Sequence, residues 1–365
     1  MRRVHTAGAV RYRVVDAQVH AWDASPQNQA GPAGERFAAG LLARHRELDG
    51  TAGTLADVER VTAEGLERDV FTAGHVDRAV LQPVLLGDLF VLGFSPTAWH
   101  AELAAPAPER FVLSGELDPD AGQAGARGIA ARVRRHDLRG LTFGESRRPG
   151  GRTPLGEPWL RRVLARCAAS GAGVVHLGTT PAVRPAPWER WRPAPGRGPR
   201  LPSWAEPVRS GSALPVRTRP VRRVPSAAFD VARFRELATA LPRTSFVLSA
   251  GCLPPAPLHG LARLPNVHVV LTEILPWIGT PEFGRAFGDL LRAFGPERLL
   301  FGSGYPLVRP GRLVERLAAY RFPPELRGRH RDPDPDAVAA ILGGNAERLY
   351  GLAPQLPAVV RSAHS

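Results

Sequence analysis

Eight short apolar runs, each followed by a stretch with helical periodicity, constrain the fold of this chain more than any other feature of its sequence. A parallel sheet built from repeated strand–helix units produces such an alternation. Eight units favour a closed (β/α)8 TIM barrel of the α/β class over an open doubly wound sheet, and no glycine-rich dinucleotide fingerprint follows the first run. The runs expected to form strands are 14–19, 79–84, 111–116, 139–143, 173–177, 245–250, 267–272 and 299–303.

Two stretches between these runs place apolar residues on one helical face, which predicts helices packed against the sheet. The chain of 365 residues is 44% hydrophobic, enough for one large core. We therefore expect a single barrel over residues 1–355 and a flexible tail over 356–365. The two helical faces are formed by Phe234, Leu237, Ala238 and Leu241, and by Phe283, Phe287, Leu290, Leu291 and Phe294.

Two segments interrupt the alternation. Residues 24–53 form a long polar connection rich in glycine and alanine after the first run, and we expect a loop insertion at the barrel end where catalytic loops lie. Residues 181–228 contain eleven prolines, ten arginines and three tryptophans, a composition that opposes regular structure. This insertion is interpreted as a lid over the barrel mouth, since tryptophans favour packing; a disordered, arginine-biased insertion stays the alternative.

The formal net charge of +14 does not by itself indicate nucleic-acid binding. The chain has no lysine, and ten arginines against two glutamates lie in 181–228, which we attribute to coding bias. Because no nucleic-acid-binding motif is present and no run of 18 apolar residues occurs, we expect neither a nucleic-acid nor a membrane partner, and a cytoplasmic location. Cys167 and Cys252 lack metal-type spacing and are expected to be reduced.

The first and last runs end in polar motifs that belong together in a barrel. Two imidazoles two residues apart on a strand point to one side and can bind one cation. A carboxylate at the last strand would bind the same metal and take the proton from the attacking water. The first run leads through Gln18 to His20, and the last ends at Gly304, so an imidazole and a carboxylate of this pattern are missing.

With these residues in place, the chain resembles the amidohydrolase-related (amidohydrolase 2) family of the metal-dependent hydrolase superfamily, which includes lactonases and non-oxidative decarboxylases. The resemblance extends over nearly the whole chain and follows the family's motif order. It implies a TIM barrel with its active site at the C-terminal strand ends, which hydrolyses or decarboxylates a small carboxylated or lactone-like substrate. The motifs are 15–23, 76–83, 108–111, 117–119, 139–141, 265–267, 294–303 and 344–352.

The resemblance assigns roles to only some of the expected site residues. His20 matches the second histidine of the first-strand motif, and His176 matches the histidine that ends the fifth strand. Gln18 replaces the first histidine, a change also met in lactonase-like members. At the end of the sixth run Ala250 stands where relatives have a histidine, so a third imidazole is missing.

Two glutamates near strand ends are candidates to complete the site. Glu145 follows the fourth run and Glu273 follows the seventh; helix capping or solvation stays the alternative for both. No cofactor is expected, and zinc bound by His20 and His176 is the alternative. An acid–base mechanism with these groups is open, because imidazole titrates near neutrality and a buried carboxyl can be tuned upward. The candidate catalytic residues are His20, His176, Glu145 and Glu273, and the candidate substrate-binding residues are Gln18, Trp22, Ser249, Ser303 and Tyr305.

The sequence thus predicts an amidohydrolase-related enzyme with a remodelled, metal-poor site. It would hydrolyse a lactone, an ester or a C–N bond of a small organic substrate, with decarboxylation as a further reaction of the family. The alternative is a catalytically inactive barrel that binds a small molecule or a protein partner, because Gln18, Ala250 and Gly304 mark three losses together. A homodimer is left open, since relatives often pair.

Overall fold

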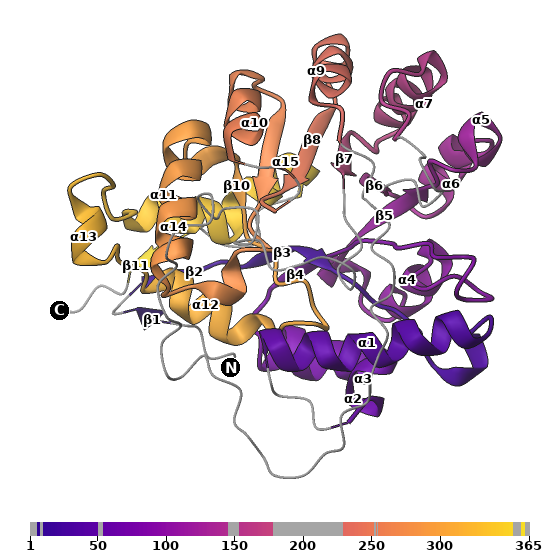
Figure 1. Cartoon of the computed structure of the whole chain (residues 1–365), viewed down its shortest axis with the longest axis horizontal. Helices are drawn as coiled ribbons and strands as arrows, with labels where there is room; N and C mark the ends of the chain where they lie inside the picture. Colours follow the sequence, from indigo (N-terminus) through magenta and orange to yellow (C-terminus); the bar gives the residue numbers. More distant parts are fainter. Residues whose placement is uncertain are drawn as a thin grey trace, which may run out of the picture.

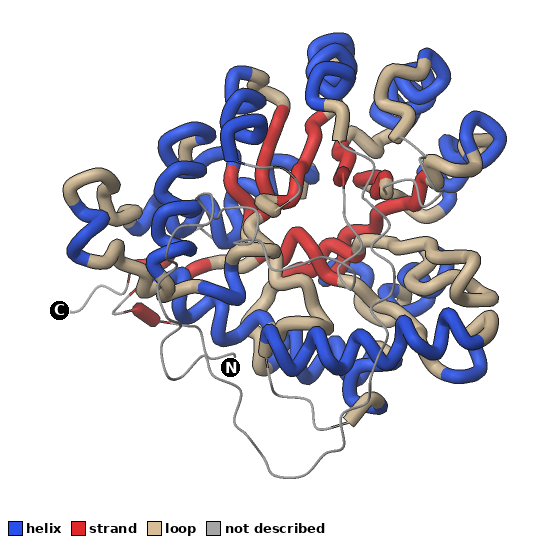
Figure 2. The backbone as a smooth tube through the Cα atoms, viewed as in Figure 1, coloured by secondary structure: helices blue, strands red, loops and turns tan. Residues whose placement is uncertain are grey.

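The computed structural model describes residues 6–7, 10–49, 54–144, 153–177, 229–251, 253, 255–352 and 359–361. Eight parallel strands form the centre of the molecule and helices surround them (Figures 1 and 2). Each strand pairs with the next in chain order, so the fold is the predicted TIM barrel and all eight predicted strands are confirmed. The strands are β3 (Val15–Val19), β4 (Arg78–Leu81), β5 (Phe111–Leu117), β6 (Gly140–Phe143), β7 (Val174–Leu177), β8 (Ser245–Ser249), β9 (Val267–Val270) and β10 (Leu299–Leu300).

The barrel closes where the chain beyond β10 runs beside β3. The N–H of Gly304 donates to the carbonyl of Gln18 at 2.9 Å, and the N–H of His20 donates to the carbonyl of Tyr305 at the same distance. A parallel bridge joins Val19 to Tyr305. Closure therefore takes place at the level of the polar residues that end β3.

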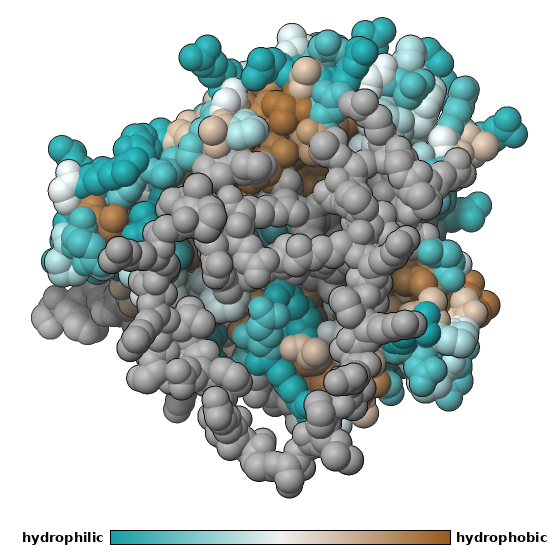
Figure 3. All heavy atoms as spheres, viewed as in Figure 1, coloured by the Kyte–Doolittle hydropathy of each residue, from teal (hydrophilic) through white to brown (hydrophobic). Residues whose placement is uncertain are grey.

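The helices of the outer layer bury the faces that their sequences predict. α9 (Val231–Ala240) and α11 (Pro281–Phe294) begin after Asp230 and Thr280, whose side chains accept N–H groups of the first turn. The apolar faces of both helices turn inward, and Figure 3 shows apolar atoms between α9 and α10 (Pro255–Gly260) beneath hydrophilic helix tips. The buried residues are Phe234, Leu237 and Ala238 in α9, and Phe283, Phe287, Leu290 and Phe294 in α11.

The remaining helical elements complete the layer around the strands. Among the described residues, no helix is long and apolar enough to cross a membrane. The α-helices are α1 (Pro32–Leu48), α2 (Ala56–Glu59), α3 (Ala63–Leu66), α4 (Thr97–Ala104), α5 (Gly122–Gly125), α6 (Ile129–Arg135), α7 (Pro158–Ala169), α12 (Pro310–Ala318), α13 (Pro324–Arg327), α14 (Pro335–Ala339) and α15 (Asn345–Tyr350). The 3-10 turns are η1 (Pro26–Asn28), η3 (Pro108–Arg110), η5 (Leu261–Arg263), η6 (Leu275–Trp277) and η7 (Pro296–Arg298). The π-helical turns are η2 (Glu67–Thr72) and η8 (Ala340–Gly344).

Two segments of the chain differ from their predicted form. The expected loop over 24–53 holds the 17-residue helix α1, which buries Ala38, Leu41 and His45 on one face. This face was missed because alanine, glycine and charged residues dilute its apolar signal. In the expected tail, β11 (Val359–Arg361) pairs antiparallel with β2 (Val10–Tyr12), and β1 (Thr6–Ala7) pairs on the other side of β2. The insertion 181–228 lies outside the described residues.

A small apolar cluster fills the interior of the barrel below the strand ends. Val15, Val80, Val174 and Leu300 contribute to it from four of the strands. α15 adds Tyr350, whose ring lies beside Gly140 on β6, where a Cβ atom would come within 3.5 Å of Tyr350 Cε1. The side chain of Tyr350 therefore lies inside the barrel and forms the floor on which the polar residues rest.

Candidate functional site

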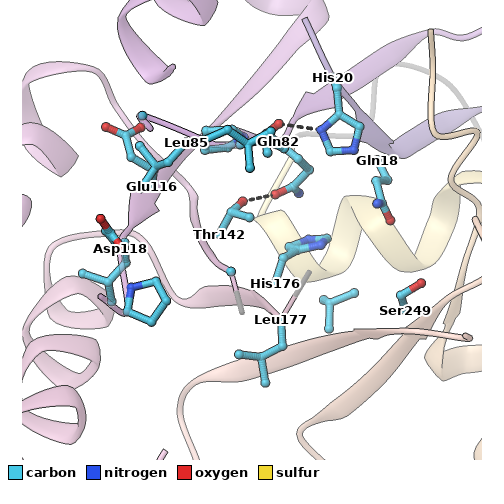
Figure 4. A pocket seen from close by; sticks show the side chains of 18 of the residues that line it. Gln18, His20, Gln82, Leu85, Glu116, Asp118, Thr142, His176, Leu177 and Ser249 are labelled. Carbon is cyan, nitrogen blue, oxygen red and sulfur yellow. Dashed lines mark hydrogen bonds between the residues drawn. The ribbon is translucent and has the colours of Figure 1, made fainter. Parts of the chain in front are cut away.

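A cavity of about 300 Å³ lies at the carboxyl ends of the barrel strands, the position where TIM barrels carry their active sites (Figure 4). Its wall combines apolar residues with a small number of polar groups, as in sites for small molecules. The polar residues of the wall come from six different strands or the segments that follow them, and β9 adds an apolar residue. They are Gln18, His20, Gln82, Asp88, Glu116, Asp118, Thr142, His176 and Ser249, while Val270 represents β9.

A bulge in β3 turns Gln18 and His20 toward this cavity. The pairing register of β3 with β4 shifts between Asp16 and Val19. The carboxylate of Asp16 holds the bulge, because its Oδ1 accepts the N–H of Gln18 at 3.1 Å and the N–H of Ser303 at 2.9 Å. Burial raises the pKa of Asp16 to about 7, although the hydrogen bonds from Ser303 and Gln18 lower it. Asp16 thus joins the first strand to the segment beyond the last one.

The imidazole of His20 has one nitrogen fixed and one nitrogen free. Nδ1 lies 2.8 Å from the carbonyl oxygen of Gln82, which can only accept, so Nδ1 carries the proton and donates. Nε2 is therefore an acceptor, and it is buried without a hydrogen-bond partner in the described structure. Burial lowers the pKa of His20 to about 4, so the ring is neutral at pH 7.

Two glutamine side chains are oriented by threonine hydroxyls. Thr272 donates to Oε1 of Gln18 at 2.9 Å, which leaves the NH2 group of Gln18 for the cavity. Thr142 donates to Oε1 of Gln82, whose NH2 group donates to the carbonyl of Ala17 at 3.3 Å (Figure 4). Both amides present a fixed polar end to the site.

His176 is held from below by the barrel floor. Its Nε2 forms a hydrogen bond with the hydroxyl of Tyr350, and the two rings stack at 18° with centroids 6.2 Å apart. Burial lowers the pKa of His176 to about 3, and the nearby His20 lowers it further. The ring is therefore neutral and lies in the middle of the cavity wall (Figure 4).

The opposite part of the wall is acidic. Glu116 accepts a hydrogen bond from Arg132 at 2.6 Å and is further bonded by Thr97, so its charge is paired. Asp118 lies beyond it, and its Oδ1 accepts the N–H of Asp120 at 2.8 Å. Glu116 and Asp118 lie across the cavity from His20 and its neighbours (Figure 4).

The structure brings four of the sequence-predicted site residues together and places four others away from the cavity. Gln18, His20, His176 and Ser249 line the cavity, and the hydroxyl of Ser249 is buried without a partner in the described part of the chain. Glu145 lies outside the described residues. The remaining four do not line the cavity, and these are Trp22, Glu273, Ser303 and Tyr305.

Each of these four side chains has a different environment. Trp22 is fully buried, donates from Nε1 to the carbonyl of Val58 at 2.7 Å and therefore packs in the core instead of facing a substrate. The hydroxyl of Tyr305 donates to Asp69 at 3.2 Å, and Ser303 accepts the N–H of Tyr305 at 3.0 Å. The carboxylate of Glu273 occupies the space directly above the Cα atom of Gly251.

The structure also places Ala250 and Gly304, two of the three positions at which a metal-binding group is missing. On β8 the inward-facing residues are Val247 and Ser249, whereas Ala250 belongs to the outer core and does not line the cavity. Gly304 has φ 71°, and a Cβ atom there would lie 2.7 Å from Cγ2 of Thr272. Thr272 therefore occupies the space that a carboxylate side chain would need.

Sequence reasoning missed several polar residues of the wall. Gln82 and Asp118 lie just after strands and inside recognised motifs, so the strand-end rule used for His20 could have found them. Tyr350 gave no such signal, because it belongs to a C-terminal helix and reaches His176 through the barrel interior.

The described residues do not fit a catalytic zinc ion, which takes three protein ligands and an open position. In the described ranges, no group of three or more His, Cys, Asp or Glu side chains could hold a metal. Nε2 of His176 is bonded to Tyr350, Oε1 of Gln18 accepts from Thr272, and Gly304 has no side chain to offer.

The sequence profile of the amidohydrolase family matches residues 15–352. The chain belongs to this family. The match covers the whole barrel, including both motifs at which β3 and β10 meet, and confirms the resemblance seen in the sequence. No curated protein matches this chain.

Solved structures share the fold of this amidohydrolase. An uncharacterized TIM-barrel protein from Bordetella bronchiseptica is 18% identical, with 93% of this chain and 99% of that one covered and a TM-score of 0.60. An amidohydrolase from Burkholderia multivorans with bound zinc is 18% identical over 93% and 100% of the two chains, with a TM-score of 0.56. For 2,6-dihydroxybenzoate decarboxylase from Rhizobium the identity is 14%, the coverage 93% and 99%, and the TM-score 0.54. At these identities the likeness is one of fold.

Proposed function

We propose that this amidohydrolase hydrolyses a lactone, an ester or a C–N bond of a small organic substrate in the strand-end cavity, and that its own side chains do so without a bound metal. Decarboxylation, the reaction in the name of the Rhizobium relative, is the other reaction that the fold family offers. The observation that carries the proposal is Nε2 of His20, a buried acceptor without a partner that faces a cavity of about 300 Å³.

His20 is suited to accept a proton from water. Its Nδ1 donates to the carbonyl of Gln82, so the lone pair of Nε2 points into the site. A pKa of about 4 keeps the imidazole unprotonated at neutral pH but also makes Nε2 a weaker base than an ordinary imidazole, so it takes the proton only as the water oxygen bonds to the acyl carbon. A water molecule bonded to Nε2 would transfer its proton there while its oxygen attacks the acyl carbon of the substrate.

Gln18 and Ser249 are suited to stabilise the oxygen that becomes negative during this attack. The NH2 group of Gln18 is left for the cavity because Thr272 binds the amide oxygen. The hydroxyl of Ser249 is buried and has no partner in the described structure. Donors that are already oriented contribute most to catalysis because they need no rearrangement as charge develops. Gln18 thus acquires a role as a donor in place of the metal-binding imidazole.

The reaction is completed by return of the proton. As the tetrahedral intermediate collapses, the bond to the leaving oxygen or nitrogen breaks, and Nε2–H of His20 donates its proton to that atom. Water has then been divided between the two products, and the imidazole is neutral again. His176 contacts the substrate as a neutral wall group whose orientation is fixed by Tyr350.

A catalytically inactive binding barrel is the second candidate. The occupied space above Gly304 and the engagement of His176 by Tyr350 favour it, because the first leaves no room for a carboxylate and the second occupies an imidazole nitrogen that could otherwise act on a substrate. Such a protein would bind a small molecule in the same cavity and release it unchanged.

Turnover of a panel of lactones and aryl esters distinguishes the two candidates. His20→Gln keeps a similar volume but removes the base, and we expect the turnover number to fall about 100-fold or more. His136→Gln makes the same change at the end of α6, away from the cavity, and should leave turnover unchanged. Turnover that is equal in the parent chain and in His20→Gln would refute the mechanism, and no turnover of any panel member would favour the binding barrel.

A further inference from the structure

We infer that the cavity takes a substrate that carries an ammonium group, and that Asp118 is the carboxylate that receives it. This inference rests on the proposed function for the reaction and extends it to the class of substrate. It follows from the charges of the wall, the pairing of each charged group and the position of the reactive end of the cavity.

The charged side chains that line the cavity in the described structure are all carboxylates. They are Asp88, Glu116 and Asp118, and no arginine is among the described lining residues. This is unexpected on composition, since the chain has 48 basic residues against 34 acidic ones.

Glu116 and Asp118 lie on the same side of the cavity, and their pairing identifies Asp118 as the one of the two that is left to bind a cation (Figure 4). Glu116 is 2.6 Å from Arg132, so its charge is already balanced. No ion pair joins Asp118 to an arginine of the described chain, and its recorded hydrogen bond comes from the backbone N–H of Asp120. An ammonium group beside Asp118 would gain a charge-assisted hydrogen bond, whereas a carboxylate or phosphate there would face like charge.

Buried polar atoms without partners show that the same cavity is built for a ligand with a second polar end. Nε2 of His20 and the hydroxyl of Ser249 both belong to side chains that are at most 3% exposed. A buried polar atom without a partner is costly, so a bound molecule that supplies the partner is stabilised. In Figure 4 these residues lie across the cavity from Asp118. The inferred substrate therefore has an ammonium group at one end and a hydrolysable acyl group at the other.

Three probes with the same six-carbon chain test the binding step without any chemistry. Hexylammonium, 1-hexanol and hexanoate differ in the charge of one terminal group, and isothermal titration gives their affinities for the full chain. We expect hexylammonium to bind about tenfold more tightly than hexanoate, a typical effect of one partly exposed charge. Equal binding of the three probes, tighter binding of hexanoate or no binding of hexylammonium would overturn the inference.

Two matched variants locate the effect. Asp118→Asn removes the charge but keeps an oxygen that can accept the N–H of Asp120, and it should weaken hexylammonium about tenfold while leaving 1-hexanol unchanged. Asp120→Asn makes the same charge change two residues later, outside the cavity wall, and should bind hexylammonium as the parent chain does. Unchanged hexylammonium affinity in Asp118→Asn would refute the assignment.

Aryl esters of 6-aminohexanoate and heptanoate, together with the half ester of adipate, separate this inference from the proposed function. Faster turnover of the 6-aminohexanoate ester supports both. Turnover of all three esters without preference for the ammonium ester would overturn the substrate class and leave hydrolysis standing. Selective binding of hexylammonium without turnover of any ester would support the substrate class and refute hydrolysis.

Discussion

Addition of one methyl group at Gly304 tests whether the position of the missing carboxylate has been closed. Gly304 has φ 71°, in the left-handed region that costs an L side chain about 1–2 kcal/mol. A Cβ atom there would lie 2.7 Å from Cγ2 of Thr272. Thr272 is stiff because it is β-branched, and its hydroxyl is bonded to Gln18, so the methyl group cannot turn away without loss of that bond.

These two costs give the expected magnitude. Overpacking of this kind costs about 1–3 kcal/mol, so Gly304→Ala should lower the free energy of unfolding by about 2–5 kcal/mol. The control is Gly40→Ala in the middle of α1, where a Cβ atom would meet nothing within 4 Å. Alanine is the better helix former, so this control should raise the free energy of unfolding by about 0.5–1 kcal/mol.

Urea unfolding of the parent chain and the variants measures both effects. The double variant Gly304→Ala with Thr272→Ser keeps the hydroxyl that binds Gln18 but removes the clashing Cγ2, and it should recover the packing cost and not the backbone cost. A Gly304→Ala variant as stable as the parent chain would refute the reasoning, because the space for a carboxylate would then still be open.

Two further predictions concern the stability of the barrel. The free energy of unfolding should fall as the pH drops from 6.5 toward 4. Burial lowers the pKa values of four histidines, to about 4 for His20 and His268 and to about 3 for His100 and His176. The unfolded chain therefore binds these protons at a higher pH than the folded chain does. Each histidine lowers the free energy of unfolding by about 1.4 kcal/mol per pH unit in this range. Asp16 acts in the opposite direction, because its raised pKa lets the folded chain bind one proton before the unfolded chain does. A urea midpoint that is equal at pH 5 and pH 7 would contradict this prediction. Asn266 donates from Nδ2 to the carbonyls of Ala238, Leu241 and Thr244 at 3.0–3.1 Å, so Asn266→Asp should destabilise the chain by more than the roughly 1–3 kcal/mol expected for Asn266→Ala. Unfolding midpoints for both variants equal to that of the parent chain would show that these bonds do not matter.

The strands of this barrel could be predicted from the sequence because each one is a short apolar run with clear boundaries. The residues that end β3 were equally accessible, since Gln18 and His20 are two positions apart and both line the cavity. Ser249, which the sequence also named as a substrate-binding candidate, lines the cavity because Val247 faces inward and residues two apart on a strand share a face.

Other parts of the site depend on contacts that no local pattern records. Tyr350 bonds to His176 across 174 residues of sequence, and Thr272 orients Gln18 across 254 residues. Such pairings are set by how the barrel closes and which helix fills its floor. For Glu273 the local pattern predicted a site residue that the structure does not confirm. This glutamate follows a strand end, but its carboxylate is directed toward Gly251 and not into the cavity.

The rate of ester hydrolysis by protein treated with a chelator and then dialysed tests the central claim most directly. The claim is that His20, oriented by Gln82, acts on water in a site whose metal-binding groups are replaced or engaged elsewhere. We expect the chelated protein and a sample supplied with equimolar zinc to turn over the 6-aminohexanoate ester at the same rate. Loss of activity on chelation, restored by one zinc ion per chain, would contradict the account.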